Sequence, residues 1–199
     1  MIALDLDNTI ICYDESFRGA AAKLDCLPAD GISLNKASIK TAAIEKGGND
    51  LWTRLQGLAY GDGIQAARLF DGCKRFINRA LDRKIKLAII SHKTEFPAIG
   101  PKVNLRMAAI NWLGNNQLSF GPLLPLMFCD SREEKVERVR TLGCQVLIDD
   151  LPEVFQCPGF PKTTRFVLFD PTGSHPEWAT SPRATSWDEA GDLVIPPRK

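Results

Sequence analysis

The chain begins with a short apolar run that leads directly into closely spaced acids, and this stretch limits the fold more than any other. Met1 to Leu4 are apolar, Asp5 and Asp7 follow at alternate positions, and Thr9 comes next in the same spacing. The aliphatic residues predict a short buried strand. Open α/β sheets bind their ligands at the carboxyl ends of strands, where these polar groups lie. A solvated turn is the alternative that this string alone leaves open.

The overall composition is typical of a globular protein and argues against several partners. The 199 residues suffice for one domain with an insertion. Lys and Arg number 25 against 24 acids, and the net charge of +1 gives no electrostatic case for nucleic acid or an anionic membrane as partner. No apolar run is long enough to span a bilayer, and acids interrupt the first one, so we expect no signal peptide and a cytoplasmic location.

The six cysteines give no sign of a metal site or a redox motif. None of them belongs to a C-x-x-C pair, which argues against zinc binding and thioredoxin-type chemistry. In a cytosolic chain they are expected to be reduced and mostly buried.

Residues 13–70 differ from the rest of the chain because they carry helical signals but no strand-like run. Asp14 can begin one helix and Ser33 or Asn35 a second, which the glycines at 47–48 can end. A third helical stretch follows. The segment is too long for a loop inside a compact core. We interpret it as a small helical insertion, a cap that can close over the strand ends.

From residue 71 onward, helical and strand-like patterns alternate. Apolar runs predict strands at 85–90, 126–129, 144–148 and 165–169. Amphipathic spacing and capping residues predict helices at 72–84, 103–113 and 131–142, with a short terminal helix begun by Ser186. This alternation predicts an α/β fold with a mainly parallel sheet.

Further polar residues stand near the ends of these elements. Ser91 follows the second predicted strand, and Lys135 lies in or just beyond the first turn of the helix at 131–142. Asp149 and Asp150 follow the fourth strand. Two adjacent acids repel each other unless a cation or a proton lies between them. These residues are therefore candidates to share one site with Asp5.

In this order the residues resemble the four motifs of the haloacid dehalogenase (HAD) superfamily. The motifs are DLDNT near the start, IIS at 89–91, Lys135 within SREEKVERV, and IDD at 148–150. The resemblance implies a Rossmann-like core with a mainly parallel five-stranded sheet in the order 3-2-1-4-5. It also implies a division into a core, 1–12 and 71–199, and a small α-helical cap, 13–70.

The resemblance also implies catalytic roles for four residues. Asp5 would be the nucleophile and form an aspartyl phosphate. Asp7 would protonate the leaving oxygen and then activate water. Ser91 would donate a hydrogen bond to the transferring phosphoryl group, and Lys135 would help neutralise the charge on the nucleophile and the phosphate.

A magnesium ion is the cofactor that the resemblance implies. Its ligands would be Asp5, the backbone carbonyl of Asp7, Asp150, and Asp149 directly or through water, an all-oxygen set that suits a hard cation. Two positions outside this set depart from the family pattern: Asn8 stands where Gly is common, and His92 where Asn is common.

Asp7 indicates which branch of the superfamily the chain resembles. A halide leaving group needs no acid, whereas an alkoxide does, so Asp7 favours a phosphatase over a dehalogenase. The predicted substrate is a phosphorylated small molecule: a sugar phosphate, a nucleotide or another organic phosphate. A phosphomutase or phosphotransferase remains open. A phospho-accepting signalling module is disfavoured because the adjacent acids come late in the chain. The oligomeric state is not indicated.

Overall fold

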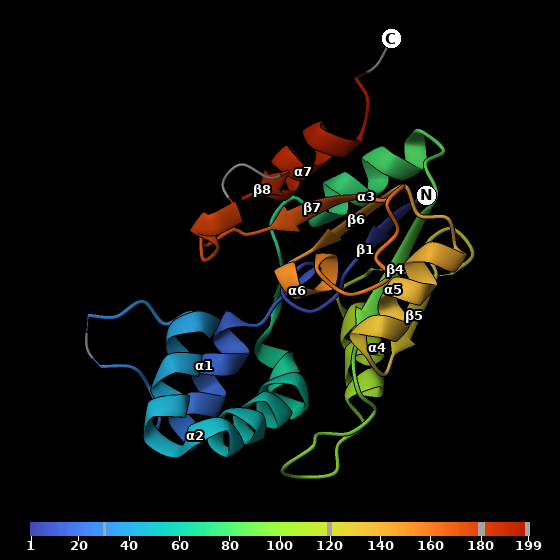
Figure 1. The fold of residues 1–199 in the computed structure, drawn as a ribbon. Helices are drawn as coiled ribbons and strands as arrows, with labels where there is room; N and C mark the ends of the chain where they lie inside the picture. Colours follow the sequence, from blue (N-terminus) through green and yellow to red (C-terminus); the bar gives the residue numbers. More distant parts are fainter. Residues whose placement is uncertain (30, 119–120, 179–181, 198–199) are drawn as a thin grey trace. The chain divides into compact units, whose positions relative to one another are not determined.

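The structure, a computed structural model, describes residues 1–29, 31–118, 121–178 and 182–197 (Figure 1). Contacts divide the chain into two compact units. The first unit consists of Met1–Ile11, Leu69–Lys93 and Ser119–Lys199, and the second of Cys12–Arg68 and Thr94–Leu118. The expected division into a core and a helical cap at 13–70 stays a prediction.

A six-stranded sheet forms the centre of the first unit, and every pair of neighbouring strands in it is parallel. In spatial order the strands are β5 (Leu126–Cys129), β4 (Leu87–His92), β1 (Ile2–Leu4), β6 (Val146–Asp149), β7 (Arg165–Phe169) and β8 (Arg183–Ala184). The first five of these confirm the expected 3-2-1-4-5 order. The expected count of five strands was wrong, because β8 adds a sixth at the edge. That strand has two residues, too few to leave an apolar pattern in the sequence.

The register of the sheet brings the carboxyl-terminal parts of its central strands close together, with β4 running three residues beyond the level of Leu4. Leu4, the last residue of β1, lies between Ile89 of β4 and Ile148 of β6. The backbone N–H of Asp5 continues this ladder by donating to the carbonyl of Ile148 at 2.9 Å. Residues that follow these strands are therefore neighbours, although they are far apart in sequence.

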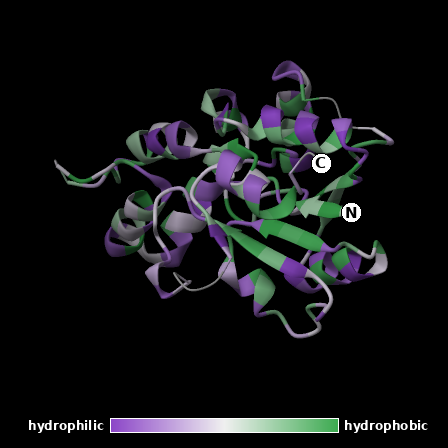
Figure 2. Cartoon of the chain, turned by 90° about the horizontal axis from the view of Figure 1, so that it is seen from above, coloured by the Kyte–Doolittle hydropathy of each residue, from purple (hydrophilic) through white to green (hydrophobic). Residues whose placement is uncertain are grey.

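Helices cover both faces of the sheet in the first unit (Figure 1). Within the described residues, the helices of this unit are α3 (Cys73–Asp82), α5 (Arg132–Thr141), the single-turn α6 (Pro152–Phe155) and α7 (Trp187–Val194), together with the 3-10 turn η2 (Pro176–Trp178). Ala3 and Ile90 pack with Val136 of α5 on one face. On the other face, the ring of Trp187 lies 5.2 Å from that of Phe169 and 4.7 Å from that of Phe76. Figure 2 shows the resulting concentration of hydrophobic residues on the strands. Such two-sided burial explains why the strands read as continuous apolar runs.

The second unit is helical, as expected for the segment after the first strand. It contains α1 (Asp14–Lys23), α2 (Lys36–Tyr60), the 3-10 turn η1 (Asp62–Ala66) and α4 (Leu105–Asn115). The long α2 is two helices joined at a kink, because Gly47 and Gly48 have non-helical backbone angles and Gly48 has φ of 69°. Only glycine adopts such a φ without steric cost, so the predicted break at 47–48 is confirmed.

Aromatic rings hold the helices of the second unit together. Phe17 of α1 stacks on Trp52 of α2, with 5.3 Å between the ring centroids, and contacts Tyr60 edge-on. Tyr13 joins the same group of rings.

Two short strands, β2 (Ile11–Cys12) and β3 (Arg68–Leu69), pair as a separate sheet. None of the helices within the described ranges has the length and apolar composition to cross a membrane.

Candidate active site

A tight turn after β1 orients the first pair of acids. The backbone N–H groups of Ile10 and Ile11 both donate to the carbonyl of Leu6, at 3.0 and 2.9 Å. Asn8 adopts φ of 63°, a left-handed conformation that asparagine tolerates better than other residues with side chains. Asn8 can therefore take the place of the glycine that is common at this position in the HAD motif, because it tolerates the backbone conformation that this turn requires.

The C-terminal helix fixes this turn from the opposite end of the chain. The indole Nε1 of Trp187 donates to the backbone carbonyl of Thr9 at 3.1 Å, and both residues are buried. Thr9 thus supports the turn through its backbone. Its hydroxyl is buried and makes no hydrogen bond within the described part of the chain.

Lys135 joins the ends of β1 and β6. Its Nζ donates to Oδ1 of Asp5 at 2.5 Å and lies 2.6 Å from Oδ2 of Asp149, with all three side chains buried. The hydroxyl of Ser131 accepts from the N–H of Glu134 and so begins α5, which places Lys135 in the first turn of the helix. The three predicted residues are brought together by the fold.

The electrostatics of this group depend on burial and on its own charges. Burial opposes the ammonium form of Lys135, but Asp149 and Asp5 outweigh burial and raise its pKa. Burial also raises the pKa of Asp5 well above its usual value, and the nearby carboxylates add to this effect while Lys135 opposes it.

Asp5, Asp149 and Asp150 form an acidic cluster that fits a hard cation. One carboxylate oxygen from each lies within 4.8 Å of the others. Asp149 is fixed by the N–H of Leu151, which donates to its Oδ1 at 3.0 Å. The ammonium of Lys135 contacts two of these acids, Asp5 and Asp149. Oxygen ligands are those that Mg²⁺ prefers.

Ser91 contributes a hydroxyl that has no hydrogen bond to the rest of the described chain. Its side chain is fully buried near the end of β4, next to β1. A buried hydroxyl without a partner costs free energy. A bound anion at the strand ends would give it an acceptor, so its place agrees with the role that the sequence predicts.

Lys93 is a residue of this region that sequence reasoning missed. Its Nζ lies 2.8 Å from Oδ2 of Asp7, and its side chain is 2% exposed. The backbone N–H of Lys93 donates to Cys129 and so prolongs β4 beyond its last assigned residue. Side chains alternate between the two faces of a strand, so Lys93 lies on the same side as Ser91, two residues earlier. This spacing is the sequence signal that could have identified Lys93 as a residue of the site.

His92, between these two residues, is exposed. Burial of its ring lowers its pKa, and Lys135 and Arg132 lower it further.

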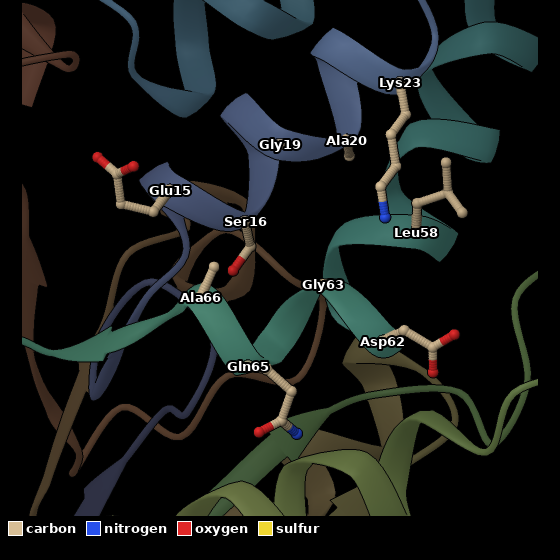
Figure 3. A pocket seen from close by; sticks show the side chains of 10 residues that line it. All are labelled: Glu15, Ser16, Gly19, Ala20, Lys23, Leu58, Asp62, Gly63, Gln65 and Ala66. Carbon is tan, nitrogen blue, oxygen red and sulfur yellow. The ribbon is translucent and has the colours of Figure 1, made fainter.

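A small cavity of about 240 Å³ lies within the second unit (Figure 3). It is lined by residues of α1, α2 and η1, among them Ser16, Lys23 and Gln65. Figure 3 shows the Ser16 side chain directed toward the segment that carries Gly63. None of the predicted site residues lines it.

Comparisons with known proteins identify the fold. No protein-family profile matches the sequence, and no curated protein is similar enough in sequence to match. Among solved structures, YfnB from Bacillus subtilis, described as a HAD-hydrolase and bound to magnesium, has a TM-score of 0.60 at 12% identity over 98% of each chain. CbbY from Rhodobacter sphaeroides, in complex with xylulose-1,5-bisphosphate, has a TM-score of 0.58 at 14% identity over 96% of this chain and 97% of its own.

A dehalogenase solved with an intermediate complex is similar to the same degree, with a TM-score of 0.60 at 14% identity over 98% of this chain and 97% of its own. The chain therefore has the fold of HAD-superfamily hydrolases, as the four motifs predicted. Because phosphate-ligand and dehalogenase structures share this fold, the reaction must be argued from the site.

Proposed function

We propose that the protein is a magnesium-dependent phosphatase that hydrolyses a small-molecule phosphomonoester through an aspartyl-phosphate intermediate. The observation that carries this proposal is the buried group of Asp5, Lys135 and Asp149, which joins two acids from different strands through one lysine. The hydroxyl of Ser91, buried near the end of the adjacent strand, supports it. Together these groups offer a nucleophile, a cation and a hydrogen-bond donor, which phosphoryl transfer requires.

The proposed reaction has two steps. In the first, a carboxylate oxygen of Asp5 attacks phosphorus, the bond to the leaving oxygen breaks, and Asp7 gives its proton to that oxygen. In the second, Asp7 takes a proton from water, the water oxygen attacks phosphorus, and the Asp5 carboxylate is released. Ser91 and Lys135 stabilise the charge on the phosphoryl oxygens in both steps.

The acidic cluster would hold the magnesium ion through Asp5, Asp150, the backbone carbonyl of Asp7, and Asp149 directly or through water. A bound Mg²⁺ would supply positive charge for the phosphoryl oxygens. The close approach of three carboxylate oxygens, one from each acid of the cluster, supports this assignment. The magnesium in the similar structure of YfnB and the bisphosphate in that of CbbY agree with it.

Asp7 favours phosphate ester hydrolysis over dehalogenation. A halide leaves as an anion without a proton, so a dehalogenase has no use for an acid beside its nucleophile. Here the Asp7 carboxylate is held in place by an ion pair, and its side chain is 16% exposed, which leaves it reachable by a substrate.

A screen for released phosphate tests the proposal. The wild-type protein is incubated with Mg²⁺ and with sugar phosphates, nucleotides or other small organic phosphates, and with 2-haloacids for halide release. We expect inorganic phosphate from at least one ester. Rearranged product without free phosphate would show a phosphomutase, a stable phosphoprotein without turnover would show a signalling module, and halide release alone would show a dehalogenase.

Asp150→Asn is expected to weaken Mg²⁺ binding at least about tenfold, because it removes one of the carboxylate charges that attract the cation. The measurement is a Mg²⁺ titration followed by calorimetry and, separately, by activity. Glu153→Gln, an exposed change three residues further on, is the matched control. Equal Mg²⁺ affinity in both variants would contradict the assignment of Asp150 as a ligand.

A further inference from the structure

The ion pair between Lys93 and Asp7 has no role in the reaction as described above. It joins the residue after β4 to the turn after β1, across two neighbouring strands. A buried ammonium is costly unless a carboxylate lies close to it, and removing one partner of such a pair is more costly still. The pair therefore fixes the position of the Asp7 side chain.

The two partners are not equally accessible. The Lys93 side chain is 2% exposed, and that of Asp7 is 16% exposed. Asp7 is therefore the member of the pair that is more accessible to a substrate.

We propose that Lys93 is a positioning residue for proton transfer by Asp7, an inference that rests on the proposed function. The ammonium lies 2.8 Å from Oδ2 of Asp7 and holds the carboxyl group in one orientation. In the first step Asp7 gives its proton to the leaving oxygen as the bond of that oxygen to phosphorus breaks and the bond from Asp5 to phosphorus forms. In the second step Asp7 receives a proton from the attacking water.

This role predicts a dependence on the leaving group. An alkyl phosphate needs the proton because an alkoxide leaves poorly, whereas 4-nitrophenolate leaves without it. Damage to the orientation of Asp7 should therefore slow the hydrolysis of alkyl esters selectively. A lysine that instead bound the phosphoryl group would matter equally for both substrates.

The experiment compares kcat of the wild type, Lys93→Met, Asp7→Asn and the double variant on 4-nitrophenyl phosphate and on the best alkyl phosphate from the screen. We expect Lys93→Met to lower kcat for the alkyl ester about 100-fold and for the aryl ester only a few-fold. The double variant should be no slower than Asp7→Asn, because both changes remove one function. Lys74→Met, on the exposed side of α3, is the control.

Equal losses on the two esters, or losses that multiply in the double variant, would overturn the positioning role and leave the proposed function intact. A wild type that releases phosphate from neither ester would overturn the proposed function itself. Lys93→Arg keeps the positive charge, and it replaces Lys93→Met in the experiment if Lys93→Met does not fold. It should retain more alkyl-ester activity than Lys93→Met where both fold, and its losses should show the same selectivity between the esters.

Discussion

Asp5→Asn is expected to abolish phosphate release, with a loss of at least about 10³-fold in kcat, because an amide oxygen is a far weaker nucleophile than a carboxylate. The side chain keeps its size and an oxygen that Lys135 can reach, so the fold should survive. The measurement is the turnover of the best substrate from the screen, with circular dichroism to verify folding.

The matched control for this change is Asp82→Asn, at the exposed end of α3. It should have wild-type turnover. Trapping of a phosphoryl group on the wild type and not on Asp5→Asn would add direct support. Turnover by folded Asp5→Asn at the wild-type rate would remove the central claim.

Lys135→Met is expected to lower the free energy of unfolding by about 3–5 kcal/mol, because it leaves Asp5 and Asp149 buried without their shared cation. In a protein of this size the melting temperature should fall on the order of 10 °C. Thermal melts in the absence of metal give the measurement, and Lys74→Met again serves as the control.

Added Mg²⁺ should recover part of the stability lost in Lys135→Met, because a cation in the acidic cluster replaces some of the missing charge. The same addition should not restore turnover, since the ammonium also stabilises the transferring phosphoryl group. A melting temperature equal to that of Lys74→Met without metal would show that the buried ion pairs contribute little to stability.

Sequence reasoning located most of the candidate site because a parallel sheet converts chain order into spatial proximity. Polar residues that follow apolar runs must meet at one edge of such a sheet, so Asp5, Ser91 and Asp149 could be placed together without coordinates. The order of the first five strands was implied by the resemblance of the four motifs to the HAD superfamily, and the sheet confirms it. Gly47 and Gly48 marked the break in α2 because they permit backbone angles that other residues avoid.

The features that were missed depend on tertiary contacts that leave little trace in sequence. A lysine is usually exposed, and the ion pair with Asp7, in the turn after a neighbouring strand, makes burial of Lys93 less costly. The edge strand β8 is only two residues long and forms through backbone pairing with β7 rather than through an apolar pattern of its own. The hydrogen bond from Trp187 to Thr9 joins residues 178 positions apart in the sequence, and a local sequence pattern gives no information about such a contact.

The central position of β1 has a consequence for how the protein is made. The proposed nucleophile is synthesised before the rest of the candidate site, yet β1 is held between β4 and β6, whose residues come later in the chain. The turn after β1 gains its last support only when Trp187 has been synthesised. During translation β1 therefore has neither of its neighbours in the sheet until β4 has been synthesised, and the candidate site forms only through contacts between residues far apart in the chain.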